Sequence, residues 1–458
     1  MAISKNADNA FTPLVLVGVL SRLGLHTNTR LIVAFSGGLD SCVLLHALCS
    51  LRQTQPWPLR VVHVDHGLQA ASAEWARHAE KFCGSLNVPC AIERVHIADI
   101  REHGVEAAAR QARYDCLARY VGKNDVLLTA HHADDQAETL LLQLLRGAGT
   151  HGLAAMPEVM PFSAGQHVRP LLGFTRPQLA RYAEQEKLRW VDDPSNADPR
   201  FSRNYIRNEV FPLLEARWPG AALKLAHTAA LSAEAVELLD AVAAKDWRFC
   251  RHENASTLSI TALRSLSLSR QRNLIRFWLR QQGFRAPSAK HLDHVMDQIA
   301  QDPRTRRAIV RWPDAEVCRY RDALIAQKPP QIRLAALKLP WNPVEPLLIP
   351  GAGLLHATAT QGEGLSQERV ANSSLTVGWR QGGEICRLRG RAHHHKLKKL
   401  LQNAGIPPWE RERLPLIYVN NELAAVSDLW VCEPYAARAD EAGWKLQLEL
   451  AQTFIGGK

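Results

Sequence analysis

The sequence has 458 residues, of which 46% are hydrophobic and 22% are charged. This length exceeds a single ordinary core, and the composition excludes a chain that is disordered over most of its length. Lys and Arg total 56 against 45 for Asp and Glu, and the net charge of +11 favours an anionic partner, above all a nucleic acid.

The first predicted element is the apolar run PLVLVGVL at residues 13–20. It is much shorter than the ~20 residues of a membrane span, and no A-x-A-like cleavage site follows it. We expect a helix packed on the first domain, no membrane segment and a cytoplasmic protein. The nine cysteines include no CxxC pair, which predicts reduced thiols and argues against a structural zinc site.

Short β-branched runs then alternate with amphipathic stretches as far as about residue 190. The predicted strands are residues 31–35, 60–64, 90–95, 125–130 and 167–171. The predicted helices are residues 41–51, 74–87, 105–121, 134–146 and 175–187. This alternation is typical of βαβ units and predicts an α/β fold with a doubly wound parallel sheet. Ligands of such sheets bind beyond the carboxyl ends of the strands.

The pattern changes after residue 215. Helices are predicted at 221–249, 269–282 and 286–300, and strands at 307–312 and 316–326. A stretch rich in proline and glycine follows, and a compact α/β pattern begins near residue 375. We therefore expect four parts: a sheet domain (1–215), a mainly helical domain (216–328), a linker with short strands (329–374) and a small C-terminal α/β domain (375–458).

The strongest motif lies between the strand at 31–35 and the helix after it, and reads Ser36-Gly37-Gly38-Leu39-Asp40-Ser41. Two glycines allow the backbone to approach a phosphate, and the helix start supplies free N–H groups. The hydroxyls of Ser36 and Ser41 add donors, and Asp40 would hold a Mg²⁺ ion that bridges the phosphates. The alternative is a plain turn in which Asp40 and Ser41 cap the helix.

SGGxDS directly after an apolar strand resembles the PP-loop ATP-pyrophosphatases. The resemblance implies that ATP is cleaved between its α- and β-phosphates, which gives AMP and pyrophosphate. It also implies that residues 36–41 surround the nucleotide, with His66 and His132 as further nucleotide contacts.

Further motifs narrow the family: VDHGL at 64–68, ARQARY at 109–114, TAHHADDQAET at 129–139, RPLL at 169–172, DDPSN at 192–196 and RNYIR at 203–207. In this order they resemble the tRNA(Ile)-lysidine synthetase family, as do residues 272–276 and 397–428. The resemblance implies three substrates: ATP, L-lysine and the isoleucine tRNA with a CAU anticodon. It implies that the C2 oxygen of the wobble cytidine is adenylated and that the lysine amine then displaces AMP.

Two pairs of charged residues are catalytic candidates because each pair shares a helical face. Asp135 and Glu138 could grip Mg²⁺ or the ammonium of an amino acid, so Asp40 and Asp135 are the expected metal ligands. Arg110 and Arg113 would contact phosphate, and a solvated helix face is their alternative. Asp134 serves equally well as a helix cap.

A rival assignment is another PP-loop modifier of tRNA bases, such as a 2-thiocytidine-type thiolase. Sulfur transfer requires catalytic cysteines or a cluster, and the absence of CxxC argues against it.

Near the C-terminus Lys396, Lys398 and Lys399 lie outside an apolar helical stripe, which favours tRNA contact over an ordinary basic surface. The helical domain is also expected to bind tRNA, and the oligomeric state, monomer or homodimer, stays open.

Overall fold

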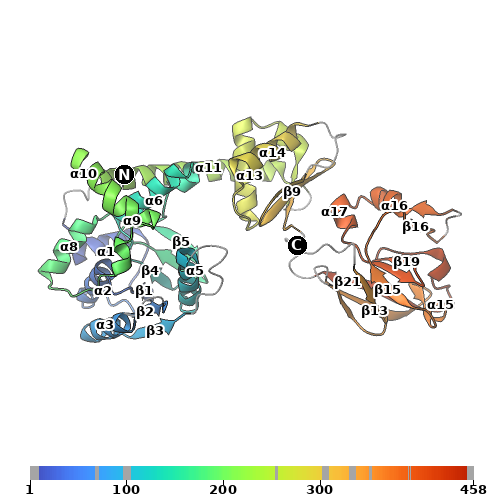
Figure 1. Ribbon diagram of the computed structural model, residues 1–458, viewed down its shortest axis with the longest axis horizontal. Coiled ribbons are helices and arrows are strands. Elements are labelled where there is room, and N and C mark those ends of the chain that lie inside the picture. Colours follow the sequence, from blue (N-terminus) through green and yellow to red (C-terminus); the bar gives the residue numbers. More distant parts are fainter. Residues whose placement is uncertain are drawn as a thin grey trace. The chain divides into compact units, whose positions relative to one another are not determined.

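The computed structural model describes residues 10–67, 72–95, 105–252, 256–301, 309–329, 337–349, 353–389, 391 and 393–450. The chain divides into two compact units, Met1–Leu239 and Asp240–Lys458 (Figure 1). Among the described residues, no helix has both the length and the apolar character needed to cross a bilayer.

The described part of the first unit is built on one six-stranded sheet with the order β3-β2-β1-β4-β6-β5. Its strands are β1 (Leu31–Ala34), β2 (Leu59–Asp65), β3 (Cys90–Arg94), β4 (Val126–Leu128), β5 (Val159–Phe162) and β6 (Gly165–Val168). All neighbours pair in parallel except β5, which forms an antiparallel hairpin with β6. The expected doubly wound sheet is confirmed, with an unpredicted edge strand. Pro161 suits that edge, because an edge strand tolerates a missing N–H.

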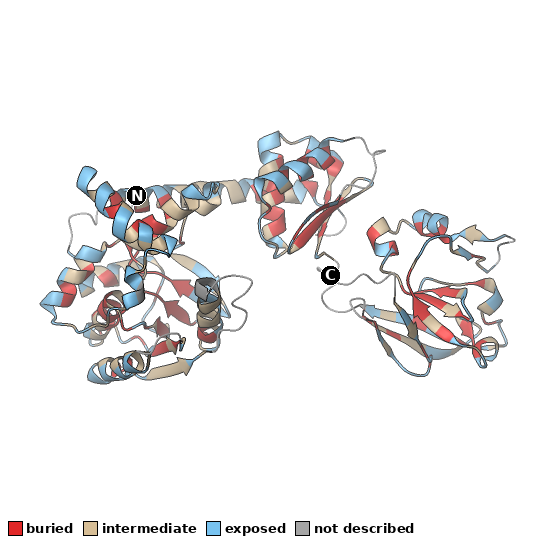
Figure 2. Cartoon of the chain, viewed as in Figure 1, coloured by how far each residue is buried: buried red, intermediate tan, exposed pale blue. Residues whose placement is uncertain are grey.

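Helices cover both faces of this sheet (Figure 1). They are α1 (Pro13–Arg22), α2 (Leu39–Ser50), α3 (Ser72–Ser85), α5 (Val105–Ala118), α6 (Ala133–Leu145), α7 (Thr150–Leu153) and α8 (Arg176–Gln185). Leu31 and Val33 pack into the larger core with α1, α2, α3 and α8, whereas Ile32 faces the α5 side with Leu117. This alternation follows from the two-residue period of a strand. The central strands are accordingly buried (Figure 2).

The predicted helix at 13–20 is confirmed as α1. Thr12 caps it, and Leu16 and Leu20 are fully buried in the larger core. After α8 come short elements that the sequence did not predict: η2 (Pro194–Ala197), α9 (Ser202–Tyr205), the π-helical turn η3 (Ile206–Val210) and α10 (Phe211–Arg217). The long helix α11 (Ala221–Cys250) follows, and the boundary between the two units falls within it.

The second unit opens with the remainder of α11 and three further helices around a four-stranded antiparallel sheet of order β7-β10-β9-β8. The helices are α12 (Ile260–Arg264), α13 (Leu268–Gln281) and α14 (Ala289–Ala300). The strands are β7 (Thr257–Ser259), β8 (Ile309–Trp312), β9 (Ala315–Tyr320) and β10 (Ala323–Gln327). The prediction of a single strand at 316–326 was wrong. The chain reverses at Arg321, which adopts a φ of 53° and so splits that stretch into a hairpin.

Two antiparallel sheets, of order β11-β15-β18-β19-β20 and β12-β13-β21-β14, and a short hairpin complete the described part of this unit. The strands are β11 (Lys338–Pro340), β12 (Leu347–Ile349), β13 (Gly353–Gln361), β14 (Leu365–Ser366), β15 (Leu375–Gly378), β16 (Ile385–Cys386), β17 (His395–Lys396), β18 (Leu416–Val419), β19 (Glu422–Val426), β20 (Trp430–Val431) and β21 (Ala442–Leu450). The helical elements are α15 (Gln367–Val370), α16 (Leu397–Asn403), α17 (Pro408–Arg411) and η5 (Glu433–Tyr435).

The segment expected as a linker contributes strands to these sheets. β11 pairs with β15, and β13 pairs with β21 along its whole length. The expectation that all cysteines are reduced thiols was wrong for one pair, because Cys386 and Cys432 form a disulfide with their Cα atoms 5.7 Å apart. These two cysteines are 46 residues apart in the sequence, so no local spacing could have predicted their pairing. The other cysteines are free.

Candidate active site

The predicted phosphate loop joins β1 to α2 at the centre of the sheet. β2 and β3 lie on one side of β1, and β4 lies on the other. The chain therefore changes direction across the sheet at the carboxyl end of β1, which is where open α/β sheets bind ligands. Gly37 has a φ of +83°, a conformation that favours glycine. The N–H of Val191 donates to the carbonyl of Gly37 at 2.9 Å and ties the loop to the segment after α8.

The start of α2 is open to an anion. Gly38 is its N-cap, and none of the described side chains caps its first turn. A methyl group at Gly38 would meet only ordinary contacts, the nearest being Oγ of Ser36 at 3.5 Å. The protein alone therefore does not require glycine there. Oγ of Ser41 donates to the carbonyl of Gly38 at 2.9 Å and lies 3.2 Å from Oγ of Ser36. These features fit a phosphate resting on the helix N-terminus.

Three carboxylates converge on His132, which precedes α6 and is 2% exposed. Its Nε2 lies 3.7 Å from Oδ2 of Asp40 and 3.5 Å from Oδ2 of Asp135, and its Nδ1 lies 3.3 Å from Oδ2 of Asp134. Burial acts to lower the pKa of His132, but the three carboxylates outweigh burial and raise that pKa well above its ordinary value. His132 is therefore protonated, and its positive charge offsets part of the negative charge of the three carboxylates.

Asp40 fits the role of a magnesium ligand. Its Oδ1 is buried and has no hydrogen-bond partner among the described residues. The same residues contain no group of three or more side chains arranged as metal ligands. That combination suits Mg²⁺, which is usually bound through one or two carboxylates together with substrate phosphates and water.

Glu138 and Asp135 face two arginines from the segment after α8. Nε of Arg203 donates to Oε2 of Glu138 at 2.7 Å, and Nε of Arg207 donates to Oε1 at 2.6 Å. Oδ1 of Asp135 lies 3.3 Å from Nη2 of Arg203 and 3.1 Å from Nη2 of Arg207. Burial acts to raise the pKa of Asp135, but His132 and the arginines hold it well below its usual range. Asp135 is therefore ionised.

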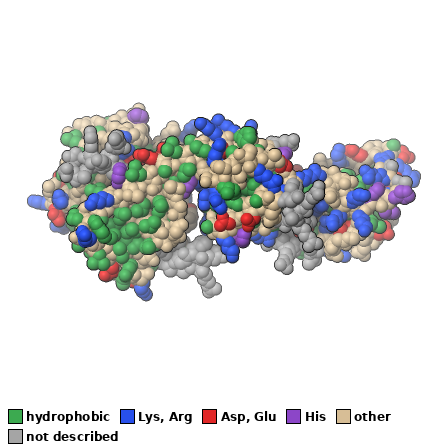
Figure 3. Space-filling view, turned by 90° about the horizontal axis from the view of Figure 1, so that it is seen from above, with side chains coloured by type: hydrophobic (Ala, Val, Ile, Leu, Met, Phe, Trp, Pro, Cys, Tyr) green, Lys and Arg blue, Asp and Glu red, His purple; other side chains and the backbone are tan. Residues whose placement is uncertain are grey.

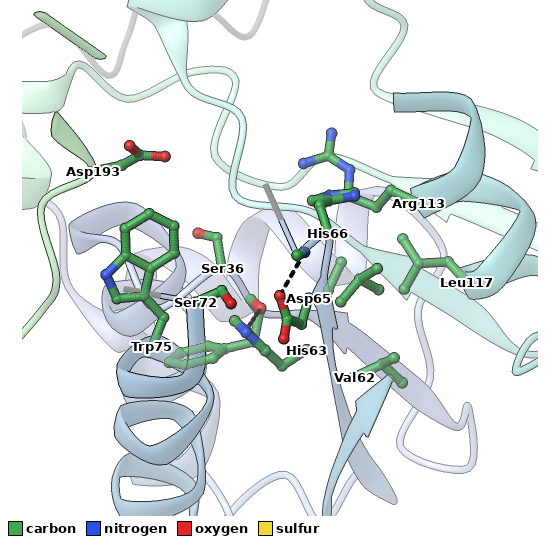
Figure 4. A pocket seen from close by; sticks show the side chains of 14 residues that line it. Ser36, Val62, His63, Asp65, His66, Ser72, Trp75, Arg113, Leu117 and Asp193 are labelled. Atoms are coloured by element: carbon green, nitrogen blue, oxygen red, sulfur yellow. Dashed lines mark hydrogen bonds between the residues drawn. The ribbon is translucent and has the colours of Figure 1, made fainter. Parts of the chain in front are cut away.

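A pocket of about 300 Å³ lies beside the phosphate loop, at the carboxyl ends of β1 and β2 (Figure 4). Trp75 and Ser72 of α3 border one side, and His66 and Arg113 border the other. Below them the N–H of Gly67 donates to Oδ1 of Asp65 at 2.8 Å and holds the end of β2. An aromatic ring, an apolar floor and a cation at the rim together suit a nucleoside joined to phosphate.

Arg113 brings a positive charge to this pocket. Burial, together with the nearby charges of Arg110 and Arg203, acts to lower the pKa of Arg113, and Tyr114 opposes them. Arg113 and Arg110 lie over the ring of Tyr114, 5.4 and 5.0 Å from its centre. Neither arginine forms an ion pair with a residue in the described part of the chain. An uncompensated guanidinium at a pocket rim favours an anionic ligand.

The sequence-predicted residues fall into two neighbouring groups. Asp40, His132, Asp135 and Glu138 form one cluster beside the phosphate loop, and His66 and Arg113 share the pocket next to it. Arg110 lies on the exposed side of α5. Sequence reasoning did not assign roles to the pocket residues Trp75 and His63 or to the two arginines that bind Glu138. The motif RNYIR at 203–207 was recognised in the sequence, but nothing in it identified Glu138 as the partner of its arginines.

Three family models match the sequence in chain order. A PP-loop domain matches residues 8–214, a TilS substrate binding domain matches 258–325, and a TilS substrate C-terminal domain matches 375–448. Among solved structures, a U34-tRNA thiolase from Methanococcus maripaludis is 20% identical and covers 47% of this chain and 76% of its own, with a TM-score of 0.41. That score is too low to support an argument from structure.

Curated relatives match nearly the whole length. A tRNA(Ile)-lysidine synthase from Coxiella burnetii is 39% identical over 440 residues, which cover 96% of this chain and 97% of the relative. One from Pseudomonas aeruginosa is 43% identical and covers 90% of this chain and 92% of the relative. The chain therefore belongs to the tRNA(Ile)-lysidine synthase family.

Proposed function

We propose that this enzyme joins L-lysine to C2 of the wobble cytidine of the isoleucine tRNA with a CAU anticodon, at the expense of ATP. The observation that carries the proposal is the uncapped start of α2 together with the contact between the partly exposed Asp40 and the buried His132. Such an arrangement binds a polyphosphate and a cation together, as an adenylating enzyme requires. Membership of the lysidine synthase family supports the identity of the nucleic acid.

The reaction we propose has two steps. The C2 oxygen of the cytidine forms a bond to the α-phosphorus of ATP, and the bond to pyrophosphate breaks. The ε-amine of lysine then bonds to C2, AMP leaves with the former C2 oxygen, and the amine gives up a proton. Adenylation is necessary because a ring carbonyl oxygen is a poor leaving group.

The proposed roles of the residues follow from their positions. The adenosine would occupy the pocket between Trp75 and His66, and the phosphates would lie on residues 36–41. Mg²⁺, held by Asp40 with Asp135 nearby, would neutralise charge on the phosphates. Arg113 would orient the phosphoryl group through its uncompensated charge. Glu138 would keep Arg203 and Arg207 in place instead of binding substrate, since both of its oxygens already accept from them.

The second unit would also contact the tRNA. Lys and Arg side chains are spread over the visible surface of the second unit (Figure 3). Lys396, Lys398 and Lys399 are all exposed there, and basic side chains supply most of the affinity for nucleic acid. The domain ranges 1–215, 216–328, 329–374 and 375–458 remain our proposal, supported by the three family matches.

Two further points belong to the proposal. A tRNA substrate implies action in the cytoplasm. A homodimer would find a surface in the hydrophobic side chains that gather on one face of the first unit (Figure 3). Leu145 and Leu213 are among the exposed large hydrophobic residues of that unit.

A sulfur-transfer reaction is disfavoured by the state of the cysteine nearest the loop. Cys42 is buried in α2, and burial raises the pKa of its thiol far above the ordinary value, with the charge of Asp40 acting in the same direction. A thiol held in that way is a poor nucleophile.

Incubation with ATP, Mg²⁺, labelled lysine and the tRNA tests the proposal. We expect label in the tRNA, together with equal amounts of AMP and pyrophosphate. Formation of ADP and inorganic phosphate would contradict it, and so would a requirement for a sulfur donor. An isoleucine tRNA with a GAU anticodon is the control, because it lacks the cytidine and should take up no label.

A further inference from the structure

Four polar side chains form a hydrogen-bonded chain beside the active site, and all of them except the half-buried His131 are buried. Nη2 of Arg169 lies 3.2 Å from Nδ1 of His167, and Nε2 of His167 lies 2.8 Å from Oγ1 of Thr129. Oγ1 of Thr129 in turn lies 2.8 Å from Nδ1 of His131. Thr129 and His131 follow β4, whereas His167 and Arg169 belong to β6 and its end. The chain therefore crosses between two neighbouring strands and ends at the edge where the phosphate loop lies.

The directions of these hydrogen bonds follow from the first member of the chain and from the single proton of the Thr129 hydroxyl. A guanidinium can only donate, so Nδ1 of His167 must accept. The ring of His167 then carries its proton on Nε2 and donates it to Thr129. The hydroxyl of Thr129 could accept a second hydrogen bond, but its own proton has no acceptor other than Nδ1 of His131 among the described residues. Donation to that nitrogen is therefore the direction that leaves no buried polar hydrogen unpaired. The reverse direction of the bond between His167 and Thr129 is excluded, because both nitrogens of the neutral His167 ring would then have to accept at once.

It follows that His131 carries its proton on Nε2. The described residues include no acceptor within hydrogen-bond distance of that nitrogen. Nε2 of His131 is also not among the buried side-chain atoms that lack a hydrogen-bond partner, so this atom is accessible. The Nε2–H group of His131 is therefore a donor available to a ligand.

Burial keeps both rings neutral. His167 is 1% exposed, and burial together with the charge of Arg169 lowers its pKa to about 3. Burial also lowers the pKa of His131 well below its ordinary value. The negative charge of Asp135 opposes this shift, and the positive charges of Arg169 and Arg113 add to it. These charges act on His131 because it lies among the residues of the active site, next to His132.

We propose that His131 presents a fixed, neutral N–H donor to an oxygen atom of the bound substrates, and that Arg169 is the positioning residue that fixes it. The inference rests on the proposed function only for the identity of that oxygen. It would be an oxygen of the phosphate that is attacked or the oxygen of the cytosine ring. A ring locked in this tautomer cannot accept a proton from the lysine amine. His131 is thereby excluded as the general base, a role left to a carboxylate.

The tautomer can be measured without any reaction. In the full-length protein labelled with ¹⁵N-histidine, two-bond ¹H–¹⁵N spectra should show His131 and His167 as Nε2–H tautomers. Thr129→Val removes the hydroxyl at nearly constant shape and should convert His131 to a mixture of tautomers, whereas Thr129→Ser should leave the spectrum as it is. Arg169→Met should release His167 as well. A wild-type His131 protonated on Nδ1 would overturn the proposal.

Activity supplies the second measurement. We expect kcat for lysidine formation to fall about tenfold in Thr129→Val, because only part of the population keeps the competent tautomer. Thr129→Ser should be close to wild type. His131→Leu should reduce kcat about a hundredfold, the usual effect of removing one aligned donor, and His131→Gln should recover part of it through its amide. Equal reductions in the Val and Ser variants would contradict the proposal. A wild-type enzyme that makes no lysidine but shows the expected tautomers would instead contradict the proposed function alone.

Discussion

Nε of Arg207 donates to Oε1 of Glu138 at 2.6 Å, across 69 residues of sequence. Arg203 binds the other carboxylate oxygen, so a single buried anion on α6 holds two cations from α9 and η3. Glu138 is 1% exposed, whereas the arginines are partly exposed. The segment after α8, which also reaches the phosphate loop through Val191, is therefore fastened to α6 by charge as well as by packing.

Glu138→Gln should lower the free energy of unfolding of the first unit by about 3 kcal/mol, since breaking a buried pair leaves uncompensated charge. Urea denaturation followed by tryptophan fluorescence measures the change. Glu209→Gln, at an exposed position on η3, is the matched control and should stay within about 0.5 kcal/mol of wild type. A Glu138→Gln protein of full stability but no activity would return Glu138 to a direct catalytic role.

Asp40→Asn should preserve the fold and lower turnover by orders of magnitude. The reason is that a bound metal stabilises the transition-state charge by several kcal/mol, and Asn offers it only a neutral oxygen. Initial rates of pyrophosphate release at increasing Mg²⁺ concentration provide the measurement, with circular dichroism as the check on folding. If the variant turns over at the wild-type rate, Asp40 belongs to the helix turn alone.

The pair between Arg30 and Asp125 should make part of the stability depend on pH. Arg30 donates to both oxygens of Asp125, and the N–H of Gly122 donates to Oδ2 at 2.7 Å. The bond to Arg30 first, and the amide second, lower the pKa of Asp125 below 3.8 against the effect of burial. A carboxyl group whose pKa is lowered by folding stabilises the protein at every pH above its unfolded-state pKa. That stabilisation disappears as the pH falls through the folded-state pKa.

Asp125→Asn should therefore cost about 1 kcal/mol at pH 7, a modest value because Arg30 is half exposed. The difference from wild type should shrink as the pH is lowered from about 5 towards 3, which urea titrations at each pH can follow. Arg30→Gln should cost a similar amount, and the double variant should cost less than the sum of the two. Additive effects would mean that the two side chains act independently.

Replacing Lys396, Lys398 and Lys399 together with alanine should weaken tRNA binding and flatten its salt dependence. For every phosphate that is no longer neutralised, the slope of log affinity against log salt should fall by ~0.7–0.9. Filter binding at several salt concentrations measures the slope. A triple alanine variant of the exposed Lys81, Lys123 and Lys187 in the first unit matches the change in net charge. Equal slopes in the two variants would show that the effect is one of total charge.

The elements of the first unit were predictable because local patterns carry them. The helix expected at 41–51 is α2 at Leu39–Ser50, and the strand expected at 60–64 is β2 at Leu59–Asp65. The period of the hydrophobic residues and the positions of the glycines are enough to locate these two elements. The hairpin strand β5 was missed because Pro161 and a short turn interrupt any alternating pattern. η3 was missed because a π-helical turn has no period of its own to detect.

The site was predictable only in part, for a different reason. The phosphate loop is a continuous motif, and its sequence alone located Asp40. The pairing of Arg207 with Glu138 and of Cys386 with Cys432 depends on the path of the chain between them, which no local spacing encodes. The hydrogen-bonded chain from Arg169 to His131 is similar, since it needs β4 and β6 to be neighbours.

The position of β1 in the sheet has a consequence for synthesis on the ribosome. β1 needs β2 on one side and β4 on the other, and its loop is closed by the N–H of Val191, far along the chain. A nascent chain that has released only β1, α2 and β2 therefore contains the phosphate loop but lacks most of what surrounds it. Because domains fold as units, ATP should bind and stabilise only a chain that has emerged past Val191. A stalled ribosome carrying a shorter chain would hold no site able to consume the nucleotide.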